Sequence, residues 1–362
     1  MKNSSAEISN AKRQAIETGL RAFVEWEKLP RVQNPVIEVS NAKLQASEAG
    51  VRAFTEPGMG LSIHWGLYSV LGLHEWCFKL NKIDPAAYAE TMKLFNPKRF
   101  NAEEWADLLL EGGHSFLMIT TKHHDGFCLW DSARTSRTVM NTPFGRDVIA
   151  ELAPALRERG LKLHLYYSLM DWDHPAYGRP ERWAEYMEYM NAQLRELLTQ
   201  YGPIHGVLFD GYWPTHPYAP DQVFWKEGGP YGFTEMYDMI HTLQPDAMIT
   251  NNHHVLPLPG EDYQVWELDY PGENRTGFNC HAVGPTPQAV WWNLNAGWSY
   301  QPFRHQLKSF EQISLTRQRC SHDRSTLMLN VGPRGYGDIH PDEAAIIRRL
   351  GTHIRNGQAG RI

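Results

Sequence analysis

The feature that most constrains the fold of this 362-residue chain is an alternation of short apolar runs with amphipathic segments, which begins near Gly60. The segments between the runs carry helix signals, such as Asn101 three residues before Glu104 and glycines that follow at 112 and 113. Strands joined by crossover helices form a parallel sheet, and seven or eight such units in about 300 residues favour closure into a (β/α)8 barrel. The runs that we expect to be strands are 61–64, 116–120, 161–167, 207–209, 247–250, 263–266 and 326–330.

Several function classes are disfavoured by composition and by missing motifs. The 35 Lys and Arg residues against 41 Asp and Glu residues give a net charge of −6, so nucleic acid is not an expected partner. The sequence has neither of the glycine-rich phosphate loops GxGxxG and GxxxxGK[ST]. It also has no signal-like N-terminal segment and no run of 18 apolar residues, so we expect a cytoplasmic protein without a membrane partner.

The first 54 residues contain an internal repeat, since residues 6–23 and 37–54 both read as similar helical segments ending in RAF. A solenoid needs at least three stacked units, so we interpret the two copies as a helical lead-in that packs on the main domain. The expected organisation is therefore this lead-in at 1–54, a catalytic barrel at 55–355 and a short tail at 356–362.

Catalytic groups of a parallel barrel lie at the C-terminal ends of its strands. His64 ends the first run, His123 and His124 follow the second, and Asp210 directly follows the fourth and precedes a glycine. Three chemistries remain open on this basis. One is a metal site, although adjacent histidines on a regular strand point to opposite faces. The second is glycoside hydrolysis, which needs two carboxyl groups, and the third is glycan binding without turnover.

The strand-end motifs resemble those of the α-L-fucosidases of glycoside hydrolase family 29. The matching segments run in family order and cover about residues 55–355. They are GLSIHWGLYSV at 60–70, HEW at 74–76, EWADLLLEGGHSFLMITTKHHDGFCLWDS at 104–132, YYSLMDWDHP at 166–175, ELLTQYGPIHGVLFDGYW at 196–213, EDYQVWELDYPGENRTGF at 261–278 and LMLNVGPRGYGDI at 327–339.

This resemblance implies a single (β/α)8-like catalytic domain that hydrolyses α-L-fucosidic bonds with retention and without a metal ion or other cofactor. Its partner would be a fucosylated glycan or a small α-L-fucoside. Asp210 matches the nucleophile and Glu267 the acid/base, for which Glu261, Glu273 and Glu75 are alternatives. The residues that match the lining of the fucose pocket are His64, Glu75, Trp76, His123, His124, Tyr167 and Trp298.

The sequence departs from the family pattern at Leu208, where Trp is frequent, at His253, where Arg is common, and at Gln288, where Glu is common. The printed chain stops at Ile362, so we expect the β-sandwich that usually follows the barrel to be absent. The N-terminal helices, or a second copy of the chain in a homo-oligomer, would then replace its contacts. A fucose- or glycan-binding protein with little or no turnover, and a metal-dependent barrel hydrolase, remain the alternative functions.

Overall fold

The computed structural model describes residues 45–56, 58–213, 231–277 and 279–359. Its strands are β1 (Met59–Ile63), β2 (Phe116–Lys122), β3 (Lys162–Ser168), β4 (Gly206–Asp210), β5 (Met248–Asn251), β6 (Gln264–Glu267), β7 (Gln288–Asn293) and β8 (Ser325–Val331). Its α-helices are α2 (Glu48–Thr55), α3 (Leu67–Leu71), α4 (Cys77–Leu80), α5 (Pro85–Glu90), α6 (Ala102–Glu111), α7 (Val148–Glu158), α8 (Trp183–Gln200), α10 (Phe233–Leu243), α11 (Phe310–His322) and α12 (Pro341–Ala359). Short 3-10 helices span Thr91–Leu94, Val139–Asn141, Pro180–Arg182 and Pro302–Arg304.

The eight strands form one sheet in the order β5-β4-β3-β2-β1-β8-β7-β6, and every paired neighbour is parallel. The fold is a nearly closed (β/α)8 barrel, as the alternating pattern predicted. All seven expected strands are present. The eighth, β7, was not predicted, because its sequence QAVWWN begins with a polar residue and has no helix signal directly beside it.

The barrel closes between β5 and β6 through a few separate hydrogen bonds, most of them made by Asp262, rather than through a regular ladder. The Asp262 backbone N–H donates to the Ile249 carbonyl at 2.7 Å, and the Ile249 N–H donates to Asp262 Oδ2 at 2.9 Å. The same carboxylate also accepts from His241 of α10 at 2.8 Å and from the backbone N–H groups of Gln45 and Ala46. Asp262 therefore ties the lead-in segment, α10 and the two edge strands together.

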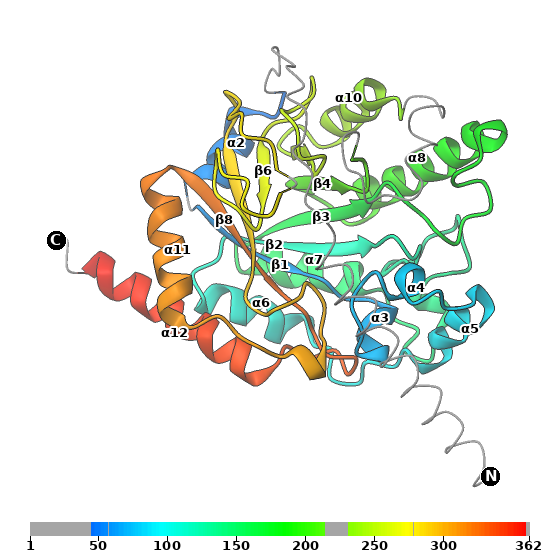
Figure 1. Cartoon of the computed structure of the whole chain (residues 1–362), viewed down its shortest axis with the longest axis horizontal. Coiled ribbons are helices and arrows are strands. Elements are labelled where there is room, and N and C mark those ends of the chain that lie inside the picture. Colours follow the sequence, from blue (N-terminus) through cyan, green and yellow to red (C-terminus); the bar gives the residue numbers. More distant parts are fainter. Residues whose placement is uncertain (1–44, 57, 214–230, 278, 360–362) are drawn as a thin grey trace, which may run out of the picture.

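Helix α2 belongs to the second copy of the repeat, and the first copy lies outside the described residues. Figure 1 shows α2 at the end of the sheet where the strands begin, opposite α4 and α5. Its Phe54 side chain is 1% exposed and lies 4.5 Å from the ring of Tyr263, centroid to centroid. The helix thus closes the N-terminal end of the barrel with a buried aromatic side chain.

The expected outer helices are present with the expected caps. The Asn101 side chain accepts hydrogen bonds from the backbone N–H groups of Glu103 and Glu104, and this begins α6. Helix α8 buries one face against the sheet, which confirms that its aromatic stripe belongs to the core. Among the described helices, none combines the length and the apolar character that crossing a membrane requires.

Candidate active site

Asp210 ends β4, and its carboxylate is held by donors on both oxygens. The Tyr166 hydroxyl donates to Oδ2 at 2.6 Å, while the Gly211 N–H donates to Oδ1 at 2.9 Å. Gly211 has φ +97°, and a Cβ there would lie 2.8 Å from Met170 Cγ, so only glycine fits directly after the carboxylate. Burial raises the pKa of Asp210 to about 6, although these hydrogen bonds oppose the shift. The sequence predicted a carboxylate at this strand end but not its raised pKa.

Glu267 ends β6 and faces Asp210 through Asn252, which follows β5. The Asn252 amide nitrogen donates to Glu267 Oε2 at 2.7 Å and to Asp210 Oδ1 at 3.3 Å. The distance between Glu267 Oε2 and Asp210 Oδ1 therefore cannot exceed the sum of these two hydrogen-bond lengths. Burial, and then the charge of Asp210, raise the pKa of Glu267 to about 8. A carboxylate and a carboxylic acid thus lie side by side.

The imidazoles of His123 and His124 lie beside Asp210, and the His64 ring lies 5.6 Å from the His123 ring. Burial lowers the pKa of His64 to about 4 and the pKa values of His123 and His124 well below the ordinary value, so all three are neutral near pH 7. His64 Nδ1 lies 2.8 Å from Asn330 Oδ1, and His124 Nε2 lies 3.7 Å from Asp210 Oδ2. These rings are suited to exchange hydrogen bonds with hydroxyl groups rather than to bind an anion.

The adjacent histidines lie close together because they follow β2 and do not continue its alternation. Strand β2 ends at Lys122, and the Gly126 N–H donates to the His123 carbonyl at 3.1 Å, which places His124 in a turn. The two ring centroids are 4.1 Å apart. The objection that neighbouring histidines must point apart therefore does not hold here.

Tyr167 does not join this group, and the residue before it does. The Tyr167 hydroxyl donates to Gln193 of α8 at 2.7 Å, and its ring lies in the layer between sheet and helices. Tyr166 faces the barrel interior, donates to Asp210 and stacks on His123 with an interplanar angle of 2°. The prediction that Tyr167 lines the site is therefore wrong for this structure, and Tyr166 lies beside Asp210 instead.

Indole rings and Glu75 enclose the site. Trp76 contacts the edge of His124 at 5.1 Å and stacks on Trp213 at 5.5 Å, whereas Trp298 lies 5.1 Å from His64. Glu75 accepts a hydrogen bond from Ser299 at 2.9 Å, and its charge contributes to the raised pKa values of Asp210 and Glu267. Trp76 therefore lies beside His124, Trp298 beside His64, and Glu75 near enough to both carboxyl groups for its charge to raise their pKa values.

Glu261 and Glu273, the two alternative acid/base residues, form bonds away from Asp210. Glu261 is fully buried and bonded to Tyr237, to His253 and to the Leu258 N–H, so it supports the loop after β5. Glu273 pairs with Arg319 at 2.6 Å and with Arg275 at 3.0 Å.

The three residues that depart from the family pattern do not contact the carboxyl groups of Asp210 and Glu267 through any hydrogen bond or ion pair among the described residues. Leu208 fills the barrel interior, and His253 bonds Glu261. Gln288 begins β7, at the opposite end of the strands from Asp210, and accepts from Trp266. Neither His253 nor Gln288 therefore replaces a group at the carboxyl pair.

Two groups of side chains in the described structure meet the proximity requirement of a metal site. The ligand atoms of His123, His124 and Asp210 lie within 4.8 Å of one another, inside the site described above. The second group is His305, His340 and Asp342.

Hydrogen bonding argues against the second group. Asn295 Oδ1 accepts two backbone N–H bonds, so its nitrogen must donate to His305 Nδ1 at 2.9 Å. The neutral His305 ring then carries its proton on Nε2, so a metal ion could bind there only by displacing that proton. Only the group around Asp210 stays open to an ion.

The known proteins that this chain resembles are α-L-fucosidases. The family model described as alpha-L-fucosidase matches residues 27–358. A solved structure of α-L-fucosidase isoenzyme 1 from Paenibacillus thiaminolyticus superposes with a TM-score of 0.73 at 30% identity, over 85% of this chain and 76% of that chain. A Bacteroides thetaiotaomicron GH29 α-L-fucosidase superposes with a TM-score of 0.75 at 25% identity, over 89% of this chain and 78% of that one. That structure is a covalent intermediate trapped with 2-fluoro-fucosyl fluoride in a glutamate-to-glutamine mutant.

Curated relatives match over different lengths. The chain is 34% identical to the plasma α-L-fucosidase of Rattus norvegicus, over 83% of this chain and 68% of that protein. It is 38% identical to α-L-fucosidase 1 of Arabidopsis thaliana, but there the match spans 43% of this chain and only 29% of the plant protein. A second plant protein, from Oryza sativa, is 40% identical over 36% of this chain and matched over 24% of its own length.

Proposed function

Because the chain belongs to the α-L-fucosidase family, glycoside hydrolase family 29, we propose that it hydrolyses terminal α-L-fucosides with retention of configuration. Asp210 is the nucleophile and Glu267 the acid/base in this proposal. The observation that carries it is the single Asn252 nitrogen that both carboxyl groups share. Its bonds of 3.3 Å and 2.7 Å together span less than the roughly 6.5–9.5 Å of an inverting site, so the spacing supports a retaining pair.

In the first step, Asp210 Oδ attacks the anomeric carbon while Glu267 gives its proton to the departing glycosidic oxygen. The C–O bond to the aglycone breaks, and an ester between the sugar and Asp210 forms. Near pH 7 the pair is in the required state, because the pKa of Asp210 is about 6 and the pKa of Glu267 about 8.

In the second step, Glu267 is an ionised carboxylate, and the negative charge on Asp210 is gone because that residue is esterified. Glu267 takes a proton from water, and the water oxygen attacks the anomeric carbon. The ester bond breaks and Asp210 returns as a carboxylate. Each carboxyl group thus ends the cycle in its starting state.

The groups around the pair support a small hydroxylated sugar as the substrate. Neutral imidazoles of His64, His123 and His124 offer donors and acceptors, and Glu75 offers a further acceptor. The rings of Trp76 and Trp298 offer apolar surface for the carbon face and methyl group of a fucose residue.

Turnover of an aryl α-L-fucoside tests the proposal. We expect activity that survives EDTA and is lost in Asp210→Ala, and we expect a 2-fluorofucosyl probe to label a peptide that contains Asp210. Probe attached to another residue, or wild-type rates in Asp210→Ala, would refute the mechanism. Binding of fucose without hydrolysis would favour a glycan-binding protein, whereas activity lost with EDTA and restored by a divalent ion would favour a metal centre at His123, His124 and Asp210.

A further inference from the structure

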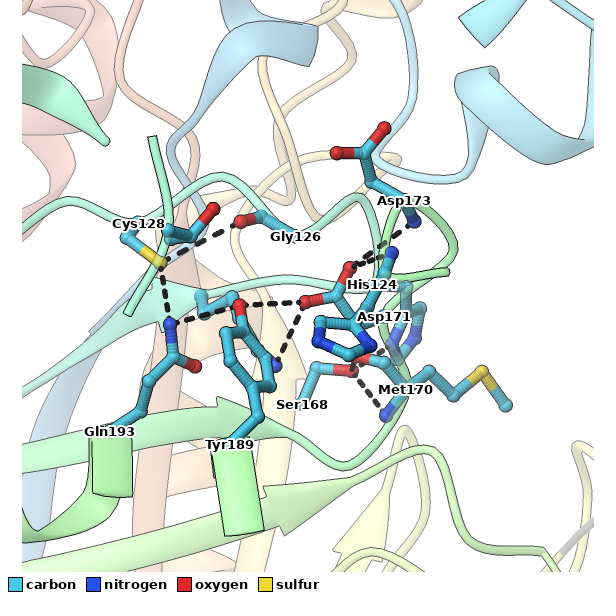
Figure 2. Close-up of polar contacts among 12 residues, drawn as sticks. His124, Gly126, Cys128, Ser168, Met170, Asp171, Asp173, Tyr189 and Gln193 are labelled. Carbon is cyan, nitrogen blue, oxygen red and sulfur yellow. Dashed lines mark hydrogen bonds and ion pairs between the residues drawn. The ribbon is translucent and has the colours of Figure 1, made fainter. Parts of the chain in front are cut away.

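Ser168, the last residue of β3, pairs in register with Asp210 and contacts Nδ1 of the His124 ring, whereas Nε2 of that ring lies near Asp210. The Ser168 oxygen lies 2.6 Å from His124 Nδ1, 2.9 Å from the Met170 carbonyl oxygen and 3.0 Å from the Met170 backbone nitrogen. Figure 2 shows these contacts between the β3 end and the His124 ring. All three residues are buried. The hydrogen bonds can therefore be assigned from the donors and acceptors that each group possesses.

A serine hydroxyl has one proton to donate and two lone pairs to accept with. The Met170 N–H can only donate, and the Met170 carbonyl can only accept. If the hydroxyl proton turned toward His124, two acceptor oxygens would face each other at 2.9 Å within the protein interior. The proton therefore goes to the Met170 carbonyl, and His124 Nδ1 must be the N–H donor to Ser168.

This assignment leaves a lone pair on His124 Nε2. Burial, together with the charges of His64 and Lys122, lowers the pKa of His124 well below its ordinary value, so the ring is neutral with one proton. Nε2 is buried, has no hydrogen-bond partner among the described residues and lies 3.7 Å from Asp210 Oδ2. His124 Nε2 and Asp210 Oδ2 are then two acceptors close to each other, and a hydrogen-bond donor placed beside them would stabilise both. A sugar hydroxyl is such a donor.

We propose that Ser168 is a positioning residue that holds His124 as the Nδ1–H tautomer, so that Nε2 accepts a hydrogen bond from a hydroxyl of the bound sugar beside Asp210. The inference rests on the proposed function for the identity of the ligand, but the tautomer itself is a property of the free protein. With the proton on Nε2 instead, the ring would present a donor toward the Asp210 carboxylate and compete with the sugar.

Hydrogen bonds around the buried Asp171 side chain keep this arrangement rigid. Asp171 Oδ1 accepts from the N–H groups of Asp173 and His174, and its Oδ2 accepts from the Tyr189 hydroxyl and contacts the Lys122 ammonium (Figure 2). The Trp172 N–H donates to the His124 carbonyl at 2.8 Å. The loop that bears Met170 and the turn that bears His124 are thus fastened to each other, which fixes the Ser168–His124 distance.

The direct experiment is two-bond ¹H–¹⁵N correlation NMR on protein labelled with ¹⁵N-histidine, with His124 assigned by comparison with His124→Gln. We expect a proton on Nδ1 and an unprotonated Nε2 in the wild type. In Ser168→Ala, the Nδ1–H loses its acceptor, so we expect the proton to move to Nε2 and kcat/KM on an aryl α-L-fucoside to fall roughly 10–100-fold. Ser168→Thr keeps the hydroxyl and should keep the Nδ1–H tautomer.

Thr326→Val is the matched control, because Thr326 is also a buried hydroxyl that donates to a backbone carbonyl, that of Phe54, at the other end of the barrel. It should leave both tautomer and activity unchanged. A wild-type proton on Nε2 would overturn the inference even if Ser168→Ala fails to fold, and so would full activity in a folded Ser168→Ala. An Nδ1–H tautomer in a protein that has no fucosidase activity would refute the proposed function and leave the tautomer assignment standing.

Discussion

Asp210 and Glu267 accept hydrogen bonds from one and the same nitrogen, that of the Asn252 side chain. Their surroundings otherwise differ. Asp210 also has the Tyr166 hydroxyl and the Gly211 N–H as donors, which stabilise its ionised form. Glu267 meets the charge of Asp210 instead, and its pKa is about 8 against about 6 for Asp210. Between these values the pair carries one negative charge, and it is on Asp210.

A bell-shaped pH dependence of kcat/KM follows from this difference. The rate should rise as Asp210 loses its proton near pH 6 and fall as Glu267 loses its proton near pH 8. Glu267→Gln should abolish the fall at high pH and reduce the rate roughly 10²–10⁴-fold on substrates with poor leaving groups, since no proton is available for the departing oxygen. Aryl fucosides with acidic phenols should lose much less. An unchanged fall at high pH in this variant would exclude Glu267 as the acid.

Asn252→Ala tests the shared donor. The Asn252 hydrogen bonds lower the pKa values of both carboxyl groups, so their removal should move both limbs of the pH profile to higher pH. The activity measured over a range of pH is the readout, and Asn141→Ala, which removes an exposed amide bonded to the Ser136 carbonyl, is the control. A lower rate with unmoved limbs would mean that Asn252 does not set these pKa values.

The neighbouring tyrosines offer a paired test of which one serves the site. Tyr166→Phe removes a 2.6 Å bond to a carboxylate, worth about 1.5–3 kcal/mol, and should shift the acidic limb to higher pH because that bond lowers the pKa of Asp210. Tyr167→Phe removes a bond to Gln193 and should cost about 1 kcal/mol of stability while leaving kcat/KM unchanged. Kinetics and urea denaturation of both variants decide the matter, and the opposite pattern would restore Tyr167 to the site.

Asp210 could be predicted from the sequence, because an Asp-Gly step after an apolar run puts a carboxylate at the C-terminal rim of a barrel. The roles of Tyr166 and Tyr167 could not be predicted in this way. The side that each tyrosine faces depends on strand register, which pairs Tyr166 with Leu208 and Ser168 with Asp210. All four of these side chains therefore face the barrel interior. A resemblance between motifs does not supply that register.

Asn252 was missed for a related reason. Its position after β5 marked it as a strand-end residue, but its role depends on where β6 lies relative to β5. Those strands meet through Asp262 and not through a regular ladder, so no periodic pattern reports their relative position. The close approach of the His123 and His124 rings was missed as well, because the alternation of a strand was applied to residues that lie beyond the end of β2.

The buried ion pair behind the site makes a prediction about stability. Lys122 Nζ lies 3.4 Å from Asp171 Oδ2, with both side chains at most 2% exposed, and 4.4 Å from the centre of the Tyr167 ring. Lys122→Met leaves the Asp171 carboxylate buried without its cation, so we expect a loss of about 3–5 kcal/mol in the free energy of unfolding. Adding Asp171→Asn should recover part of that loss, because the uncompensated charge is then gone.

Lys93→Met provides the comparison, since Lys93 also pairs with a carboxylate, that of Glu90 at 2.6 Å, but both side chains are more than half exposed. Its removal should change the free energy of unfolding by no more than about 1 kcal/mol. Urea denaturation followed by tryptophan fluorescence measures all three variants. Equal effects of Lys122→Met and Lys93→Met would mean that the Lys122–Asp171 pair does not stabilise the loop that carries Ser168 and Met170.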